Sequence, residues 1–328
     1  MHLLLRGNAL LALASAIVWG GGDFSGGAAV KAAGGSVRSA FRVVLLSHSV
    51  SLSILLLLSL VWGGSWPVGS NLVWGLVAGL LAALSLIAFY LALSGGAMGA
   101  AAALSGLLAA AIPAVVSSFS EGPPGLRRLA GFAVAGLAIW MVAAGPSTRL
   151  PVAGAPAQTP AQTQGADRRS MILAILAGIG FGLYFVAMKM AGRGGLLWPM
   201  TTVRIGSVTT CAVLVLATLS ATSPSAPAKQ SEGESESSDP PQPLKPTPAY
   251  LPRQAVLWAM GPALLDTGGN LLFMAATRLG RLDVASVLAS LYPASTILLA
   301  AWIFHERPTR RQGLGMLTAA AAVLLITL

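Results

Sequence analysis

Long apolar runs separated by short polar breaks fill most of this chain. A helix of about 20 apolar residues crosses the hydrocarbon core of a bilayer. The pattern therefore predicts an all-α membrane protein with ten transmembrane helices. These cover residues 10–30, 41–62, 71–93, 97–119 and 127–145 in the first half, and 170–191, 199–219, 253–277, 282–304 and 311–328 in the second.

Two polar segments interrupt the apolar pattern. Residues 146–169 are rich in Pro, Gln and Ala without periodicity, which is typical of a linker. Residues 221–252 are dense in Pro, Ser and Glu and cannot bury a core, so they are expected to form a disordered acidic loop. The expected domains are thus a five-helix unit at 1–145 and a second at 170–328.

The two halves repeat one another. Residues of the first half recur at a constant spacing in the second: Phe89, Ala92, Gly96, Ala101 and Leu104 as Phe273, Ala276, Gly280, Ala285 and Leu288. Nearer the start of each half, Gly20 and Arg42 match Gly182 and Arg204. An odd number of helices per half makes the second half enter the membrane from the opposite side. The sequence therefore predicts inverted five-helix repeats, a pattern of many secondary transporters.

Composition supports a membrane protein and excludes several other classes. Charged residues are 9% of the chain, against about a quarter in soluble domains, and apolar residues are 55%. The net charge of +10 comes from scattered basic residues that form no basic face, so nucleic acid is not an expected partner. Three histidines and one cysteine offer no metal centre, and no cofactor is expected.

A family resemblance rests on short motifs that cover both halves. They are Trp19-Gly20 leading to Gly22-Asp23-Phe24, then Arg42, and the series Ala285, Pro293, Glu306 and Gly313. With these motifs the sequence resembles the EamA family of the drug/metabolite transporter superfamily. The resemblance implies ten helices around a central cavity, a multi-pass protein of the cell membrane, and cytoplasmic termini. The Lys and Arg residues of the two sides nearly balance, so the orientation depends on the resemblance alone.

Two acids lie inside apolar spans, where a charged side chain is energetically costly and is therefore rare unless it has a function or a partner. Asp23 falls in the first span and Asp266 in the eighth, and neither recurs in the other half. Asn270 shares a helical face with Asp266. These residues are candidate proton- or substrate-binding groups. The alternative is that protonated or hydrogen-bonded acids hold two helices together.

Aromatic residues could complete a substrate site for an amphipathic or cationic solute. Packing between helices is the alternative for each of them, and it is the better interpretation for any single ring. The glycines around Asp23 could permit either a broken helix or close helix contact. The aromatic candidates are Trp19, Phe24, Tyr90, Phe181, Tyr184 and Tyr292.

Four basic residues near the spans are candidates for gating or anchoring. Arg42 and Arg204 occupy equivalent places in the repeat and either reach to the membrane interface or form a symmetric gate. His48 and Lys189 are weaker candidates. Glu121 and Glu306 end their spans and are expected to cap or anchor helices.

No enzyme or ATPase motif occurs in the chain. The favoured function is a secondary transporter, a proton-coupled exporter of a small metabolite or drug-like solute that works by alternating access. Its partners are the solute, protons and the bilayer, and it would act as a monomer or homodimer. A channel is disfavoured because no helix carries a polar stripe. A non-transporting scaffold or a subunit of a lipid-carrier flippase remains the alternative.

Overall fold

The computed structural model describes residues 2–94, 98–143, 160–220, 250–303 and 309–327. Every regular element in these ranges is an α-helix. In chain order they are α1 (His2–Ala32), α2 (Val37–Trp62), α3 (Ser70–Ser94), α4 (Met98–Ser120), α5 (Leu126–Ala143), α6 (Pro160–Gly192), α7 (Leu197–Ser220), α8 (Arg253–Leu279), α9 (Leu282–Ala289), α10 (Tyr292–Ile303) and α11 (Arg310–Thr327). The predicted all-helical fold is confirmed.

The helix boundaries correct one assignment to the linker. The segment at 146–169 was expected to be a linker, but α6 begins at Pro160, so its last ten residues are helical. Proline is favoured in the first turn of a helix because its missing N–H would have no partner there. The rest of the linker, and most of the acidic loop predicted at 221–252, lie outside the described residues.

The ninth predicted helix is divided into α9 and α10. The break falls at Ser290 and Leu291, directly before Pro293 in the first turn of α10. Proline cannot donate the backbone hydrogen bond to residue 289, and its ring clashes with that carbonyl, so the helix restarts. Pro113, by contrast, lies inside an unbroken α4. The broken helix of this bundle is thus at Pro293.

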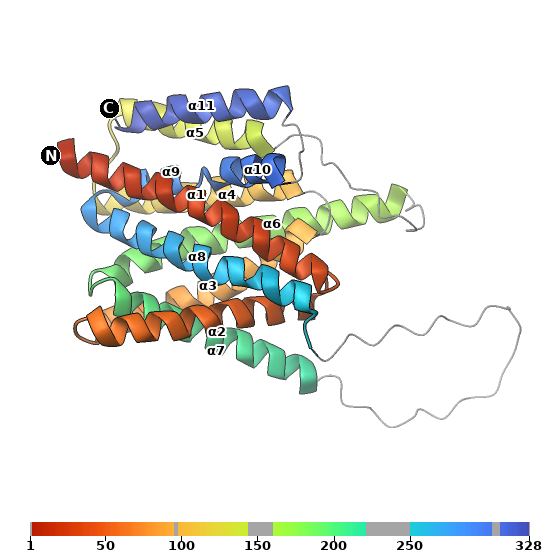
Figure 1. Cartoon of the computed structure of the whole chain (residues 1–328). Helices are drawn as coiled ribbons and strands as arrows, with labels where there is room; N and C mark the ends of the chain where they lie inside the picture. The colour runs from red at the N-terminus through yellow and green to blue at the C-terminus, as the bar shows by residue number, and fades with distance from the viewer. Residues whose placement is uncertain (1, 95–97, 144–159, 221–249, 304–308, 328) are drawn as a thin grey trace, which may run out of the picture.

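Helix α1 continues without a break past its glycines. A Cβ atom added at Gly22 would lie 3.3 Å from the backbone nitrogen of Asp266, and one added at Gly269 would clash with Trp19. Gly22 therefore serves the close packing of α1 on α8, the second of the two expectations for the glycines around Asp23. Figure 1 shows the two helices crossing side by side in the middle of the bundle.

Within the described residues, five helices are long and apolar enough to cross a membrane: Gly7–Ala32, Val37–Trp62, Ser70–Leu93, Arg168–Gly192 and Leu197–Thr218. The bundle also exposes many large apolar side chains, among them Leu57, Leu60 and Leu216. Such a surface suits a lipid environment better than water. The chain is therefore a multi-pass membrane protein, and the remaining predicted spans stay predictions.

Two pairs of helices, each with one member from either half of the chain, pack antiparallel. In the α2–α7 pair, Ser59 bonds to Thr201 and His48 to Ser207. In the α5–α11 pair, Gly131 faces Ile326 while Gly315 faces Val142. The chain also returns to its starting end, so that both termini lie at one end of the bundle (Figure 1). We call this the terminal end.

Helices α3 and α7 approach closely through small residues. A Cβ added at Gly79 would lie 2.2 Å from the carbonyl oxygen of Val203, and one added at Gly206 would lie 2.6 Å from that of Leu76. Neither carbonyl can move away without shifting its helix. The contact therefore requires glycine at both positions.

Replacing Gly79 by Ala is expected to destabilise the bundle by about 1–3 kcal/mol, because the added methyl group overpacks a backbone contact. The matched control is Gly313→Ala on α11, where an added Cβ meets nothing within 4 Å. Thermal unfolding of the two purified variants in detergent measures the difference. Equal melting temperatures would show that the α3–α7 approach is looser than described.

Candidate functional site

A buried arginine occupies the centre of the polar contacts. Arg204 lies on α7, its side chain is 1% exposed, and it is among the largest fully buried side chains. Its Nη2 donates to Asp266 Oδ2 on α8 at 2.5 Å. Its Nε donates to Ser51 Oγ on α2 at 2.8 Å. Because a buried guanidinium needs a counter-ion and hydrogen-bond acceptors, this network of three helices satisfies it.

The contact with Arg204 determines the protonation of His48. Arg204 Nη1 lies 3.1 Å from His48 Nε2, and a guanidinium nitrogen can only donate, so Nε2 must accept. The proton therefore sits on Nδ1, which donates to Ser207 Oγ at 2.8 Å. Ser207 in turn donates to the carbonyl of Arg204 at 3.2 Å. In this arrangement His48 is neutral.

Two hydroxyl groups complete the arginine network. Thr267 donates to the carbonyl of Ala263 at 2.7 Å, which leaves its oxygen free to accept. Ser51 therefore donates to Thr267 at 2.5 Å while it accepts from Arg204. Each hydroxyl group thus has one consistent assignment as donor and as acceptor. The hydrogen bonds together hold Arg204 and Asp266 in one orientation.

Asp23 lies next to this network but does not join it. Gly22, its neighbour on α1, packs against the backbone of Asp266, and the Asp23 carboxyl interacts electrostatically with Asp266. The side chain is half-buried. Among the described residues, Asp23 has no hydrogen bond and no ion pair. It is thus an unpaired acid at the middle of an apolar bundle.

Aromatic rings fill the space around the two acids. Trp19 stacks on Phe185 with ring centroids 5.2 Å apart and donates to Asn270 Oδ1 at 3.1 Å. Phe181 packs edge-on against Phe89, which also contacts Tyr292. All of these rings are buried or partly buried, so packing between helices is the role that their contacts show.

Three tyrosines bring hydroxyl groups into the same region. Tyr292 shares a hydrogen bond of 3.1 Å with Ser105. The hydroxyl groups of Tyr90 and Tyr184 are buried, and neither has a hydrogen-bond partner among the described residues. Tyr90 packs directly on Gly26, one turn from Asp23 on α1. A buried hydroxyl group without a partner has lost its hydrogen bonds to water and gained none in the protein, which is unfavourable. The hydroxyl groups of Tyr90 and Tyr184 can therefore each donate a hydrogen bond to a ligand.

Three predicted candidates lie apart from the central network. Phe24 packs edge-on against Trp258, with centroids 6.0 Å apart. Arg42 is half-buried and is not among the partners of Arg204 or Asp266. Arg204 has an acid opposite it on α8, and a symmetric gate with Arg42 stays a prediction. Lys189 forms an ion pair with Glu121 near the terminal end.

Glu121 joins two helices at the terminal end of the bundle. Its Oε2 accepts from the backbone N–H of Leu282 at 3.1 Å, at the start of α9, and from Ser117 at 2.9 Å. Arg281 donates to the carbonyls of Glu121 and Gly122. This is the capping role expected for Glu121, whereas Glu306 lies outside the described residues.

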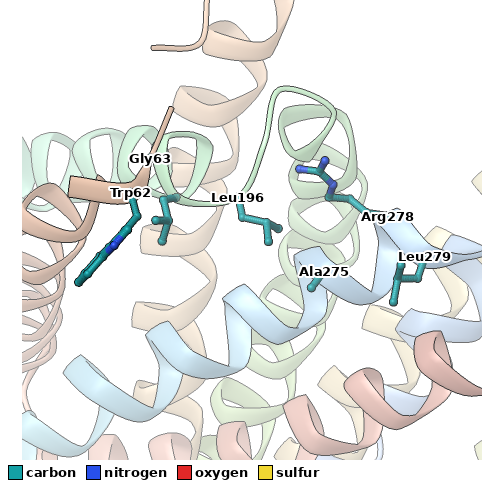
Figure 2. A pocket seen from close by; sticks show the side chains of 7 residues that line it. Trp62, Gly63, Leu196, Ala275, Arg278 and Leu279 are labelled. Atoms are coloured by element: carbon teal, nitrogen blue, oxygen red, sulfur yellow. The ribbon is translucent and has the colours of Figure 1, made fainter. Parts of the chain in front are cut away.

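A separate open cavity of about 460 Å³ lies at the terminal end. Figure 2 shows Trp62 and Arg278 on opposite sides of it, with Leu196 and Ala275 between them and Leu279 next to Arg278. Its lining is mostly apolar, and none of the predicted site residues contributes to it. The candidate site is therefore the polar network in the bundle, not this surface hollow.

The hydroxyl groups that hold Arg204 were not predicted from the sequence. Ser51, Thr267 and Ser207 are small polar residues of a kind that occurs throughout the spans, so nothing marks them individually. The usable signal was their helical spacing. Ser51 follows His48 by three residues, and Ser207 follows Arg204 by three, which places each pair on one helical face.

Comparison with known proteins supports the membrane fold. Residues 168–328 match the model of the EamA-like transporter family. One solved structure, described only as the crystal structure of a protein, covers 97% of this chain and 95% of its own, with a TM-score of 0.63 and 15% sequence identity. That likeness shows the fold alone. No curated protein matches the chain.

Removing one partner of the Arg204–Asp266 pair should destabilise the protein more than removing both. The variant Asp266→Asn leaves a buried guanidinium uncompensated, which costs about 3–5 kcal/mol. Adding Arg204→Gln should recover much of that loss. A double-mutant cycle of unfolding midpoints measures the coupling between the two residues. Additive effects would contradict the pairing.

Proposed function

Through its second half, residues 168–328, the chain belongs to the EamA-like transporter family of the drug/metabolite transporter superfamily, and we propose that it is a proton-coupled exporter of a small metabolite or drug-like solute. The observation that carries the proposal is the unpaired, half-buried Asp23 beside Asp266 in the middle of an apolar bundle. Acids at such depth are functional more often than structural.

The proposed mechanism is alternating access between two inverted repeats. Three observations support the repeats: α2 and α7 run antiparallel, α5 and α11 do so as well, and both termini lie at one end. Helices related by an inverted repeat must run in opposite directions where they meet. One half can then rock against the other around a site near the bilayer midplane.

The coupling step requires an acid that exchanges a proton between the two sides. A carboxyl group in a low-dielectric site resists ionisation, so it can bind a proton and still release it to water. Asp23 is the proposed proton- and substrate-binding group, Asp266 lies beside it, and Asn270, Trp19 and the tyrosines line the site. A cationic solute competes with the proton for the same carboxylate. This competition alone is enough to couple export of the solute to import of a proton.

The orientation proposed is the one the family implies, with both termini in the cytoplasm of a cell-membrane protein. Two exposed positions report on opposite ends of the bundle. Lys31 ends α1 at the far end, and Ser65 lies between α2 and α3 at the terminal end.

A labelling experiment tests the orientation. In a Cys211→Ala background, Lys31→Cys should react with an impermeant maleimide in intact cells, whereas Ser65→Cys should react only after the cells are opened. Gel-shift of the labelled protein gives the readout. Labelling of Ser65→Cys alone in intact cells would place the termini outside.

A transport assay tests the function. Solutes whose export depends on the gene are identified by an untargeted comparison of culture media and then offered to proteoliposomes under a pH gradient. We expect gradient-driven flux that falls about 10–100-fold in Asp23→Asn, the effect of losing one charge-assisted contact. The control Asp23→Glu keeps the carboxyl group and much of the flux. Flux no greater than that of protein-free liposomes in all three proteins would favour the scaffold alternative.

A further inference from the structure

The two acids of the central site differ in one decisive respect. Asp266 already has a partner for its charge, because Arg204 donates to it at 2.5 Å and is itself 1% exposed. Releasing Asp266 to bind a proton or a ligand would leave that guanidinium buried without a counter-ion. Such a loss is strongly destabilising, so the pair is expected to persist while Asp23 binds and releases its proton.

Asp23 has no such partner. Its charge faces Asp266 on α8, and the neighbouring titratable groups are Tyr90 on α3 and Tyr292 on α10. Arg204 and His48 lie beyond Asp266, and both are committed to the arginine network. No cation among the described residues forms an ion pair with Asp23.

The charges of the site therefore do not balance. It holds two carboxylates and one guanidinium, and His48 is neutral because its Nε2 accepts from Arg204. With both acids ionised, one negative charge in the low-dielectric centre stays uncompensated. The centre is neutral only when one positive charge joins it.

We propose that Asp23 alone is the exchangeable group, which binds either one proton or the ammonium group of an organic monocation, while Asp266 stays ionised as the fixed counter-ion of Arg204. The site then accepts one positive charge at a time. A cargo that carries two charges, or none, would leave the centre charged or fail to displace the proton.

The tyrosine hydroxyl groups extend this description of the cargo. Tyr90 and Tyr184 have buried hydroxyl groups with no partner among the described residues, and Tyr90 packs one turn from Asp23. A cargo with an oxygen acceptor near its ammonium group would pair a hydroxyl group that is otherwise unsatisfied. An amino alcohol or a quaternary ammonium alcohol has this chemistry.

The ammonium cargo rests on the proposed transport function, but the assignment of the proton site does not. It is tested on purified protein without any transport, by infrared spectroscopy of the carboxylic C=O stretch during a pH titration. Loss of flux in proteoliposomes and loss of the titrating band are therefore separate results.

Three proteins are titrated: the parent, Asp23→Asn, and the double variant Arg204→Gln with Asp266→Asn. We expect a buried carboxylic band in the parent that disappears in Asp23→Asn and remains in the double variant, which removes both charges of the pair and so avoids an unpaired buried ion. A band that survives in Asp23→Asn, or is lost in the folded double variant, would overturn the assignment.

The cargo is probed with choline and with its uncharged carbon isostere, dimethylbutanol. Competition predicts that choline lowers the midpoint of the Asp23 band by about one pH unit for each tenfold increase above its dissociation constant. Dimethylbutanol should leave the midpoint unchanged. An equal shift with both probes, or no shift with choline, would overturn the ammonium cargo.

Discussion

The ion pair between Arg204 and Asp266 is the constraint around which the centre of this protein is organised. A guanidinium that is 1% exposed in an apolar bundle must be fully satisfied, and side chains from α2, α7 and α8 converge on it. Arg204 keeps His48 neutral by donating to its Nε2, and it compensates the charge of Asp266. Asp23 is then the acid of this centre that has no ion pair among the described residues. The proposed chemistry of the site follows from that division.

The packing of the helices explains how such a polar centre fits into a membrane protein. Glycines let α1 lie directly on α8 and α3 on α7, so that the polar groups meet across short distances. The antiparallel pairs α2–α7 and α5–α11 join the two halves along their lengths. A rocking motion of one half against the other would have to slide the helices of these pairs past one another. The break before Pro293 separates α9 from α10 and is a point at which the chain could bend during that motion.

The sequence predicted the helices well because apolar length is a strong signal, and it located both acids because charges are rare in such spans. It could not tell which acid is paired. Arg204 and Arg42 look equivalent in the repeat, and the pairing of Arg204 with an acid on the facing helix depends on tertiary register, which the sequence does not show. The division at Pro293 was missed as well, because Pro113 shows that a proline need not break its helix.

Experimental structures at two pH values, on either side of the Asp23 titration, distinguish the fixed acid from the exchangeable one. We expect the contact between Arg204 and Asp266 to be the same in both structures, while the surroundings of the Asp23 carboxyl change as it gains a proton. A structure in which Arg204 leaves Asp266 and pairs with Asp23 would contradict the claim, because the fixed and exchangeable acids would then have traded roles.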